Sequence, residues 1–199
     1  MPARIIASQL ASVMSDIPVR RSYKRKMNFV RSLLETGGVT IVKGNSAEIL
    51  SLAGKSGQAR GVDALASAEQ EVRAACAELA KSYSCTVVAT GEKDFMSDGT
   101  DVLELRGGSA FLTRFSRSGC VLGGLMAACA GAFAKMETVG AFLAPALTAA
   151  ACMKCASEEA ERHAEVKGPM SFKTALLDTL AALTGARLKE WVKENCVQP

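Results

Sequence analysis

A serine-glycine-cysteine turn that precedes a run of small residues is the part of this sequence best suited to chemistry. Its residues are Ser118, Gly119 and Cys120, and the small and apolar run extends to Ala134. The N-terminus of a helix presents unpaired backbone N–H groups and a partial positive charge, so small residues there let an anion approach closely. We therefore predict a phosphate-binding helix start, whose field would favour a thiolate that acts as a base or nucleophile at Cys120. Taken alone, the turn also fits an ordinary helix start with a buried cysteine.

Polar residues follow two short apolar segments that we expect to be strands, 39–42 and 86–89. Asn45 and Glu48 come after the first segment, and Thr90 comes after the second. A parallel sheet binds ligands beyond the carboxyl ends of its strands, so these residues indicate a site. Two other interpretations stay open, because Asn45 and Glu48 have the spacing of a helix capping box and Thr90 fits a turn at a strand end.

The elements that must position these residues alternate between strands and helices, which predicts an α/β fold with a parallel sheet covered on both faces. Asp98 and Gly99 predict a hairpin turn within 95–105. The apolar periodicity predicts helices over 28–35, 46–53, 66–82, 120–134, 137–164 and 171–184, the fifth with an interruption at Pro145.

Composition favours one folded domain, since 49% of the 199 residues are hydrophobic and 22% are charged. Much of the net charge of +4 lies in 20–26, which we expect to be a solvated basic segment and not a nucleic-acid contact. The uncharged runs 119–134 and 138–153 are shorter than the roughly 20 residues that a membrane span needs. Seven cysteines without an export signal favour a cytoplasmic chain with reduced thiols.

Four motifs in order resemble those of the hydroxyethylthiazole kinase family. They are 43–48 (KGNSAE), 90–94 (TGEKD), the turn 116–120 (SRSGC) and 167–172 (KGPMSF). The resemblance runs from about 27 to 191 and covers roughly the C-terminal two-thirds of a family member. It implies a ribokinase-like three-layer sandwich with a mostly parallel sheet that lacks its N-terminal part. The domain division that it implies is a divergent basic segment, 1–26, followed by a partial kinase domain, 27–199.

The resemblance also implies an activity, the ATP-dependent phosphorylation of the hydroxyl of 4-methyl-5-(2-hydroxyethyl)thiazole in thiamine biosynthesis or salvage. The cofactors would be ATP and Mg²⁺, and the protein would form a homotrimer. By the same resemblance, Cys120 lies near the alcohol as the catalytic residue, and Glu48 helps to hold the metal. The residues that correspond to the family's nucleotide site are Lys43, Asn45, Thr90, Ser118 and Gly119.

The chain departs from the family pattern at three positions. Lys43 replaces an arginine that contacts ATP, and Arg117 replaces a glycine that lets the substrate approach the turn. Asp16 lies 29 residues before Asn45, the spacing of the magnesium-holding aspartate in the family's Asp-Pro-Val-Gly motif, but here the proline and valine follow one position late and the glycine is absent. These departures, with the missing N-terminal part, leave a second hypothesis open: a noncatalytic nucleotide-binding or assembly protein derived from the kinase fold.

Overall fold

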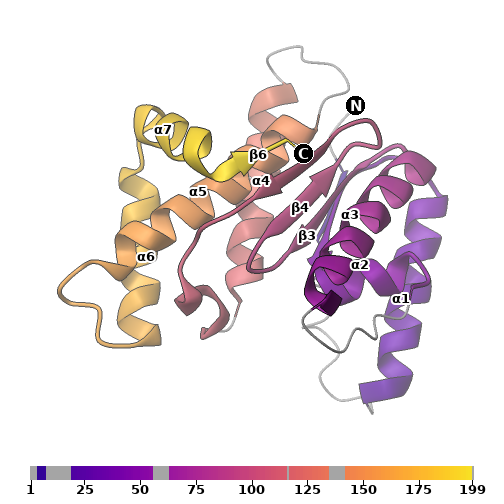
Figure 1. The fold of residues 1–199 in the computed structure, drawn as a ribbon, viewed down its shortest axis with the longest axis horizontal. Coiled ribbons are helices and arrows are strands. Elements are labelled where there is room, and N and C mark those ends of the chain that lie inside the picture. Colours follow the sequence, from indigo (N-terminus) through magenta and orange to yellow (C-terminus); the bar gives the residue numbers. More distant parts are fainter. Residues whose placement is uncertain (1–3, 8–18, 56–62, 116, 135–141, 199) are drawn as a thin grey trace.

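The structure, a computed structural model, describes residues 4–7, 19–55, 63–115, 117–134 and 142–198. A six-stranded sheet lies at its centre, with the strands in the order β1-β2-β3-β4-β5-β6 (Figure 1). The strands are β1 (Arg4–Ala7), β2 (Val39–Asn45), β3 (Thr86–Thr90), β4 (Asp94–Ser97), β5 (Val102–Leu105) and β6 (Cys196–Val197).

Helices cover both faces of the sheet, which confirms the predicted three-layer α/β fold (Figure 1). On one face lie α1 (Val19–Glu35), α2 (Ser46–Leu52) and α3 (Asp63–Tyr83). The 3₁₀ helix η2 (Ala110–Thr113) leads to the helices of the other face, which are α4 (Ser118–Ala134), α5 (Leu143–Glu161), α6 (Pro169–Ala182) and α7 (Gly185–Asn195).

The sheet is parallel in one half and antiparallel in the other. β1, β2 and β3 pair in parallel, whereas β3–β4, β4–β5 and β5–β6 pair antiparallel. The reason is the length of the connections: α2 and α3 carry the crossover from β2 to β3, but only residues 91–93 join β3 to β4 and only 98–101 join β4 to β5. The predicted hairpin is therefore confirmed, and the expectation of a mostly parallel sheet holds only for β1 to β3.

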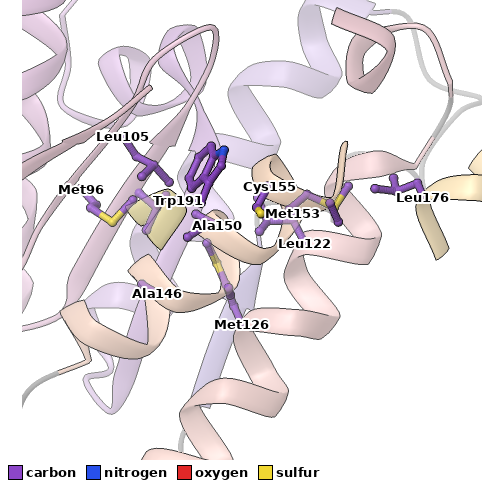
Figure 2. Close-up of a cluster of buried hydrophobic side chains, with 14 of the residues drawn as sticks. Met96, Leu105, Leu122, Met126, Ala146, Ala150, Met153, Cys155, Leu176 and Trp191 are labelled. Carbon is purple, nitrogen blue, oxygen red and sulfur yellow. The ribbon is translucent and has the colours of Figure 1, made fainter. Parts of the chain in front are cut away.

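Two hydrophobic clusters fill the layers on either side of the sheet. Alternation along β2 places Ile41 in the cluster under α4 to α7 and Val42 in the cluster under α1 to α3. Figure 2 shows the first cluster, in which Trp191 of α7 lies with Met96 and Leu105 of the sheet near the small residues of α5. The Ala-rich sequence of α5 thus lets the helix lie close to the sheet.

Besides small shifts of helix ends, the helices differ from the predictions in three respects. Pro145 does not interrupt α5, because it lies in the first turn, where no intrahelical N–H bond is lost. α7, which the sequence analysis missed, follows α6 after Leu183 and Thr184. α1 runs across the boundary between the predicted segments 1–26 and 27–199, and this domain division stays a prediction.

Candidate functional site

A cavity of about 320 Å³ lies where the carboxyl ends of β2 and β3 meet the start of α4. Asn45, Thr90, Ser118 and Gly119 all line it, so the structure brings together four of the residues predicted to bind a nucleotide. Asn45 and Thr90 are register partners at the last pair of β2 and β3. The rest of the wall includes apolar side chains from η2, α4 and α5, as an aromatic ligand would require.

The start of α2 holds Asn45 and Glu48 in a capping box. The Asn45 N–H donates to Glu48 Oε2 at 2.8 Å, and the Glu48 N–H donates to Asn45 Oδ1 at 2.9 Å. Gly44 permits this arrangement, because a Cβ there would lie 3.1 Å from Glu48 Cβ. The capping interpretation is therefore correct for these two residues. The same bonds fix the half-buried Glu48 carboxylate, which lines a small neighbouring pocket with Lys43 and is not part of the cavity wall.

Only part of the predicted metal site can be tested against the structure. Asp16 lies outside the described residues. No group of three or more His, Cys, Asp or Glu side chains suited to a metal ion occurs in the part of the chain that the structure describes. Mg²⁺ usually keeps several waters and takes one or two protein carboxylates together with substrate phosphates. Glu48, fixed by its capping bonds, fits the role of one such ligand.

The sequence analysis expected Lys43 to contact the nucleotide. Lys43 lies on β2, however, and is not among the residues that line the cavity. It is buried, with 4% of its surface exposed. Burial lowers the pKa of the Lys43 ammonium, and the charges of Glu48, Cys120 and Asp94 raise it in part. Lys43 is thus a buried cation whose charge these three groups only partly offset.

Arg117 has a left-handed backbone, with φ of 75°, and is exposed. Glycine adopts this conformation without strain, whereas a residue with a Cβ pays for it by about 1–2 kcal/mol. The Arg117 carbonyl accepts bonds from the N–H groups of Cys120 and Val121, at 2.9 and 3.2 Å, and so starts α4. Cys120 is half-buried in the first turn of α4, next to the cavity residues Ser118 and Gly119.

Three charged residues of the cavity wall, Glu92, Asp94 and Lys154, carried no assigned role in the sequence analysis. Asp94 of β4 is buried, accepts a bond from the Gly91 N–H at 2.9 Å, and lies 3.6 Å from Lys154 Nζ. Burial raises the pKa of the Asp94 carboxyl, against the opposing effects of Lys154, the Gly91 N–H and Lys43. Lys154 ends the uncharged run 138–153, and a charge at that place in a helix was the signal that the sequence offered.

A larger cavity of about 860 Å³ lies on the other side of the 91–93 turn, between α2 and α3. Both cavities include Gly91 and Glu92. Lys93 pairs with Glu69 at 2.8 Å in the wall of this larger cavity. None of the predicted site residues that the structure describes lines it, so the smaller cavity is the candidate site.

The helices that the structure describes include none that is both long and apolar enough to cross a membrane. This finding agrees with the length of the uncharged runs in the sequence.

Comparison with known proteins places the chain in a family. The model of the hydroxyethylthiazole kinase family matches residues 14–186. The chain is 38% identical over 174 residues to hydroxyethylthiazole kinase 1 of Clostridium botulinum (strain Hall, type A), covering 86% of this chain and 61% of that protein. It is 37% identical over 169 residues to the hydroxyethylthiazole kinase of Clostridium kluyveri, covering 83% of this chain and 58% of that protein.

A solved structure shares the fold. The hydroxyethylthiazole kinase protein of Pyrococcus horikoshii OT3 superimposes with a TM-score of 0.67 at 23% identity, covering 94% of this chain and 62% of that one. The chain spans 61% and 58% of the lengths of the two curated relatives named above. By its sequence, the chain belongs to the hydroxyethylthiazole kinase family.

Proposed function

We propose that this chain binds ATP with Mg²⁺ and takes part in transferring the γ-phosphoryl group to the hydroxyl of 4-methyl-5-(2-hydroxyethyl)thiazole, a step of thiamine biosynthesis or salvage. Family membership supports the reaction class. The observation that carries the site assignment is the cavity whose wall joins Asn45, Thr90, Ser118 and Gly119 at the carboxyl ends of parallel strands.

Charge stabilisation is the main task of such a site, because phosphoryl transfer needs in-line positioning and little covalent help from the protein. The first turn of α4 supplies backbone N–H groups and the positive end of a helix 17 residues long. Ser118 and Gly119 place that turn in the cavity wall, where it would receive the phosphates. The buried ammonium of Lys43 adds a positive charge behind the wall, in place of the family's arginine.

The alcohol must lose its proton as its oxygen attacks, and Cys120 Sγ is the acceptor that we assign. Cys120 follows Ser118 and Gly119 in the first turn of α4 and is not itself a wall residue, so this role requires the alcohol to lie between the cavity and the sulfur. Glu48 would hold Mg²⁺, which, when bound, neutralises charge on the nucleotide phosphates. Asp16 would be a second carboxylate partner, and Arg117 would lie on the side from which the thiazole approaches.

Calorimetry with millimolar ATP–Mg²⁺ tests the nucleotide assignment. We expect a measurable heat of binding, and Glu48→Ala should weaken only the part of the affinity that depends on magnesium. Glu104→Gln is a suitable control, since Glu104 is buried in an ion pair and lines none of the cavities found among the described residues. No heat from folded protein would reject the assignment.

Product analysis then separates the kinase from a noncatalytic nucleotide-binding protein. A kinase forms hydroxyethylthiazole phosphate, and Cys120→Ala lowers the rate without lowering the affinity for ATP. Binding of ATP with no product would instead support the noncatalytic hypothesis for this chain. Equal rates in the parent chain and in Cys120→Ala would remove the proposed role of the thiol and leave the nucleotide site in place.

The cytoplasmic location and the homotrimer stay predictions. An assembly would cover sheet edges, which are prone to uncontrolled pairing when exposed. Light scattering tests the assembly, and a well-behaved monomer would contradict it. Cell fractionation tests the location.

A further inference from the structure

Lys154 is a buried lysine whose ammonium bonds mainly to the backbone. Only 6% of its side chain is exposed. Its Nζ donates to the carbonyls of Glu92 and Gly107, both at 2.9 Å, and lies 3.5 Å from the Gly91 carbonyl. Asp94 Oδ1, at 3.6 Å, balances the charge. An ammonium has three donors, so this set of oxygens uses its whole hydrogen-bonding capacity.

The carbonyls belong to two separate segments that meet at the candidate cavity. Gly91 and Glu92 form the turn between β3 and β4 and are part of the cavity wall. Gly107 belongs to the loop 106–109, which leads from β5 into η2, and η2 contributes Leu112 and Thr113 to the same wall. Lys154 itself lines the cavity from α5. One ammonium therefore joins three sides of the site.

The loop 106–109 is shaped to lie against this lysine. Gly107 and Gly108 have φ of 75° and 95°, a backbone that favours glycine. A Cβ on Gly108 would lie 3.0 Å from Lys154 Cγ, which is closer than side chains normally pack. The two glycines thus allow the loop to lie close enough for the Gly107 carbonyl to reach the ammonium.

Other residues of α5 already hold the N–H groups of this loop. Glu158 Oε1 accepts from the Gly108 N–H at 2.7 Å, and Ser157 Oγ accepts from the Ser109 N–H at 2.9 Å. Neither residue lines the cavity among the described wall residues. Ser157 and Glu158 therefore hold the loop to α5, whereas Lys154 also connects the loop to the 91–92 turn.

We propose that Lys154 is a positioning residue of the nucleotide site: it joins the 91–92 turn to the 106–109 loop and so fixes the wall against which the nucleotide binds. This inference rests on the proposed function for the identity of the ligand. Lys154 acts through the backbone of Gly91, Glu92 and Gly107 and is not assigned a contact with ATP. Because its ammonium offsets the negative partial charge of these carbonyl oxygens, its loss would leave that partial charge uncompensated at the cavity.

Two readouts on four proteins test the proposal: the parent chain, Lys154→Met, the double variant Lys154→Met/Asp94→Asn, and Glu104→Gln. Hydrogen exchange by NMR follows the Gly91, Gly108 and Ser109 amides in the unliganded protein, and calorimetry measures ATP–Mg²⁺ affinity. The double variant leaves no unpaired buried carboxylate, so it serves if Lys154→Met alone does not fold. Glu104→Gln breaks a buried ion pair on the other face of the same hairpin and is the matched control.

We expect both Lys154 variants to raise exchange at the three amides and to weaken ATP binding by about ten- to hundredfold, the effect of losing charge-assisted bonds. Glu104→Gln should leave ATP affinity within about twofold, because its contacts lie outside the cavity. A double variant with parental loop exchange and parental ATP affinity would overturn the proposal, since Lys154 would then only balance Asp94. Exchange raised evenly over the whole chain would overturn it too. Loop-specific exchange in a protein that never binds ATP would remove the nucleotide assignment and leave the positioning role standing.

Discussion

The two faces of the β4–β5 hairpin each carry a buried ion pair, and the two pairs are built differently. In the antiparallel register Asp94 lies opposite Leu105 and Phe95 lies opposite Glu104. Asp94 faces Lys154 of α5, and Glu104 faces Arg73 of α3. We call these the cavity pair and the α3 pair. They share one hairpin, so their differences reflect local surroundings.

The α3 pair satisfies its carboxylate with side chains. Glu104 is 1% exposed, and its two oxygens bond to Arg73 and to Arg106, the second at 2.6 Å. Both guanidinium groups reach solvent, and that of Arg73 also lies 5.0 Å from the centre of the Phe95 ring. In the cavity pair both charges are buried, and the ammonium bonds to backbone carbonyls of two loops. The α3 pair therefore stabilises the layers, whereas the cavity pair shapes a site.

The largest expected effect is on stability. Lys154→Met should destabilise the fold by about 3–5 kcal/mol, because it leaves Asp94 buried without its cation. Glu104→Gln should cost about 1–3 kcal/mol, since the arginines left behind can turn to solvent. Urea unfolding of both variants measures the difference. A larger loss in Glu104→Gln would contradict the distinction between the two pairs.

The loop 106–109, which bonds to Lys154 of the cavity pair, gives a second test of the comparison. At Gly107 a Cβ would lie 2.5 Å from Glu158 Oε1 and 2.8 Å from Trp191 Cζ2, on a backbone with φ of 75°. Gly107→Ala should therefore cost about 2–4 kcal/mol, from steric overlap and left-handed strain together. Gly124→Ala is the control, because a Cβ there meets nothing within 4 Å on helix α4, and it should stabilise by about 0.5–1 kcal/mol. A tolerated Gly107→Ala, seen as an unchanged unfolding midpoint, would mean that the loop is not held closely against α5.

The sequence predicted the cavity residues that belong to strand ends and to the helix start. Asn45, Thr90, Ser118 and Gly119 lie next to element boundaries, and boundaries follow from local patterns of apolar and small residues. The same local reasoning predicted the hairpin at Asp98 and Gly99. It could not predict that the antiparallel half of the sheet ends with β6, because β6 comes from the far end of the chain and pairs with β5.

The cavity pair could not be predicted from local sequence patterns, for a different reason. Asp94 and Lys154 are 60 positions apart, and in the sequence Lys154 is simply the charge that ends the uncharged run 138–153. Its carbonyl partners carry no side-chain signal, because any residue type has a carbonyl oxygen. The glycines at 107 and 108 were the remaining trace of this contact in the sequence, and their meaning depends on what lies opposite them.

Lys43 is buried like Lys154, and it predicts a pH dependence of opposite sign to that of the buried thiols. Burial lowers the pKa of Lys43, so the unfolded chain holds its proton to higher pH than the fold does. Stability should therefore rise with pH between the lowered value and the unfolded value of 10.5, by up to about 1.4 kcal/mol per pH unit. Burial raises the pKa of Cys76 to about 12 and of Cys85 to about 11, so these groups lower stability as the unfolded thiols ionise.

Lys43→Met isolates the lysine from the thiols, which are the same in both proteins. The difference in unfolding free energy between the variant and the parent chain should shrink steadily as the pH rises toward 10.5, because the parent loses its buried charge. Chemical unfolding at several pH values above 7 measures this difference. A constant difference would show that burial does not shift the pKa of Lys43.

The smallest expected effect compares two left-handed residues, one beside the cavity and one away from it. Arg117 and Ser84 are the described residues other than glycine with positive φ, at 75° and 51°. Glycine at either position removes about 1–2 kcal/mol of backbone strain and adds roughly 0.5–1 kcal/mol of entropy to the unfolded chain. Arg117→Gly and Ser84→Gly should therefore each stabilise the fold by about 0.5–1 kcal/mol, measured by urea unfolding.

ATP binding and product formation should distinguish Arg117→Gly from Ser84→Gly, although the two variants have similar stability. Ser84 follows α3 at the opposite end of β3 from Thr90, so Ser84→Gly should leave ATP binding and product formation unchanged. If the Arg117 guanidinium obstructs the alcohol, Arg117→Gly raises the rate of thiazole phosphorylation with unchanged ATP affinity. If it binds a phosphate, ATP affinity falls by about ten- to hundredfold, as expected for a charge-assisted bond. Identical behaviour of both variants in every assay would mean that Arg117 is tolerated strain at the start of α4 and plays no part in the site.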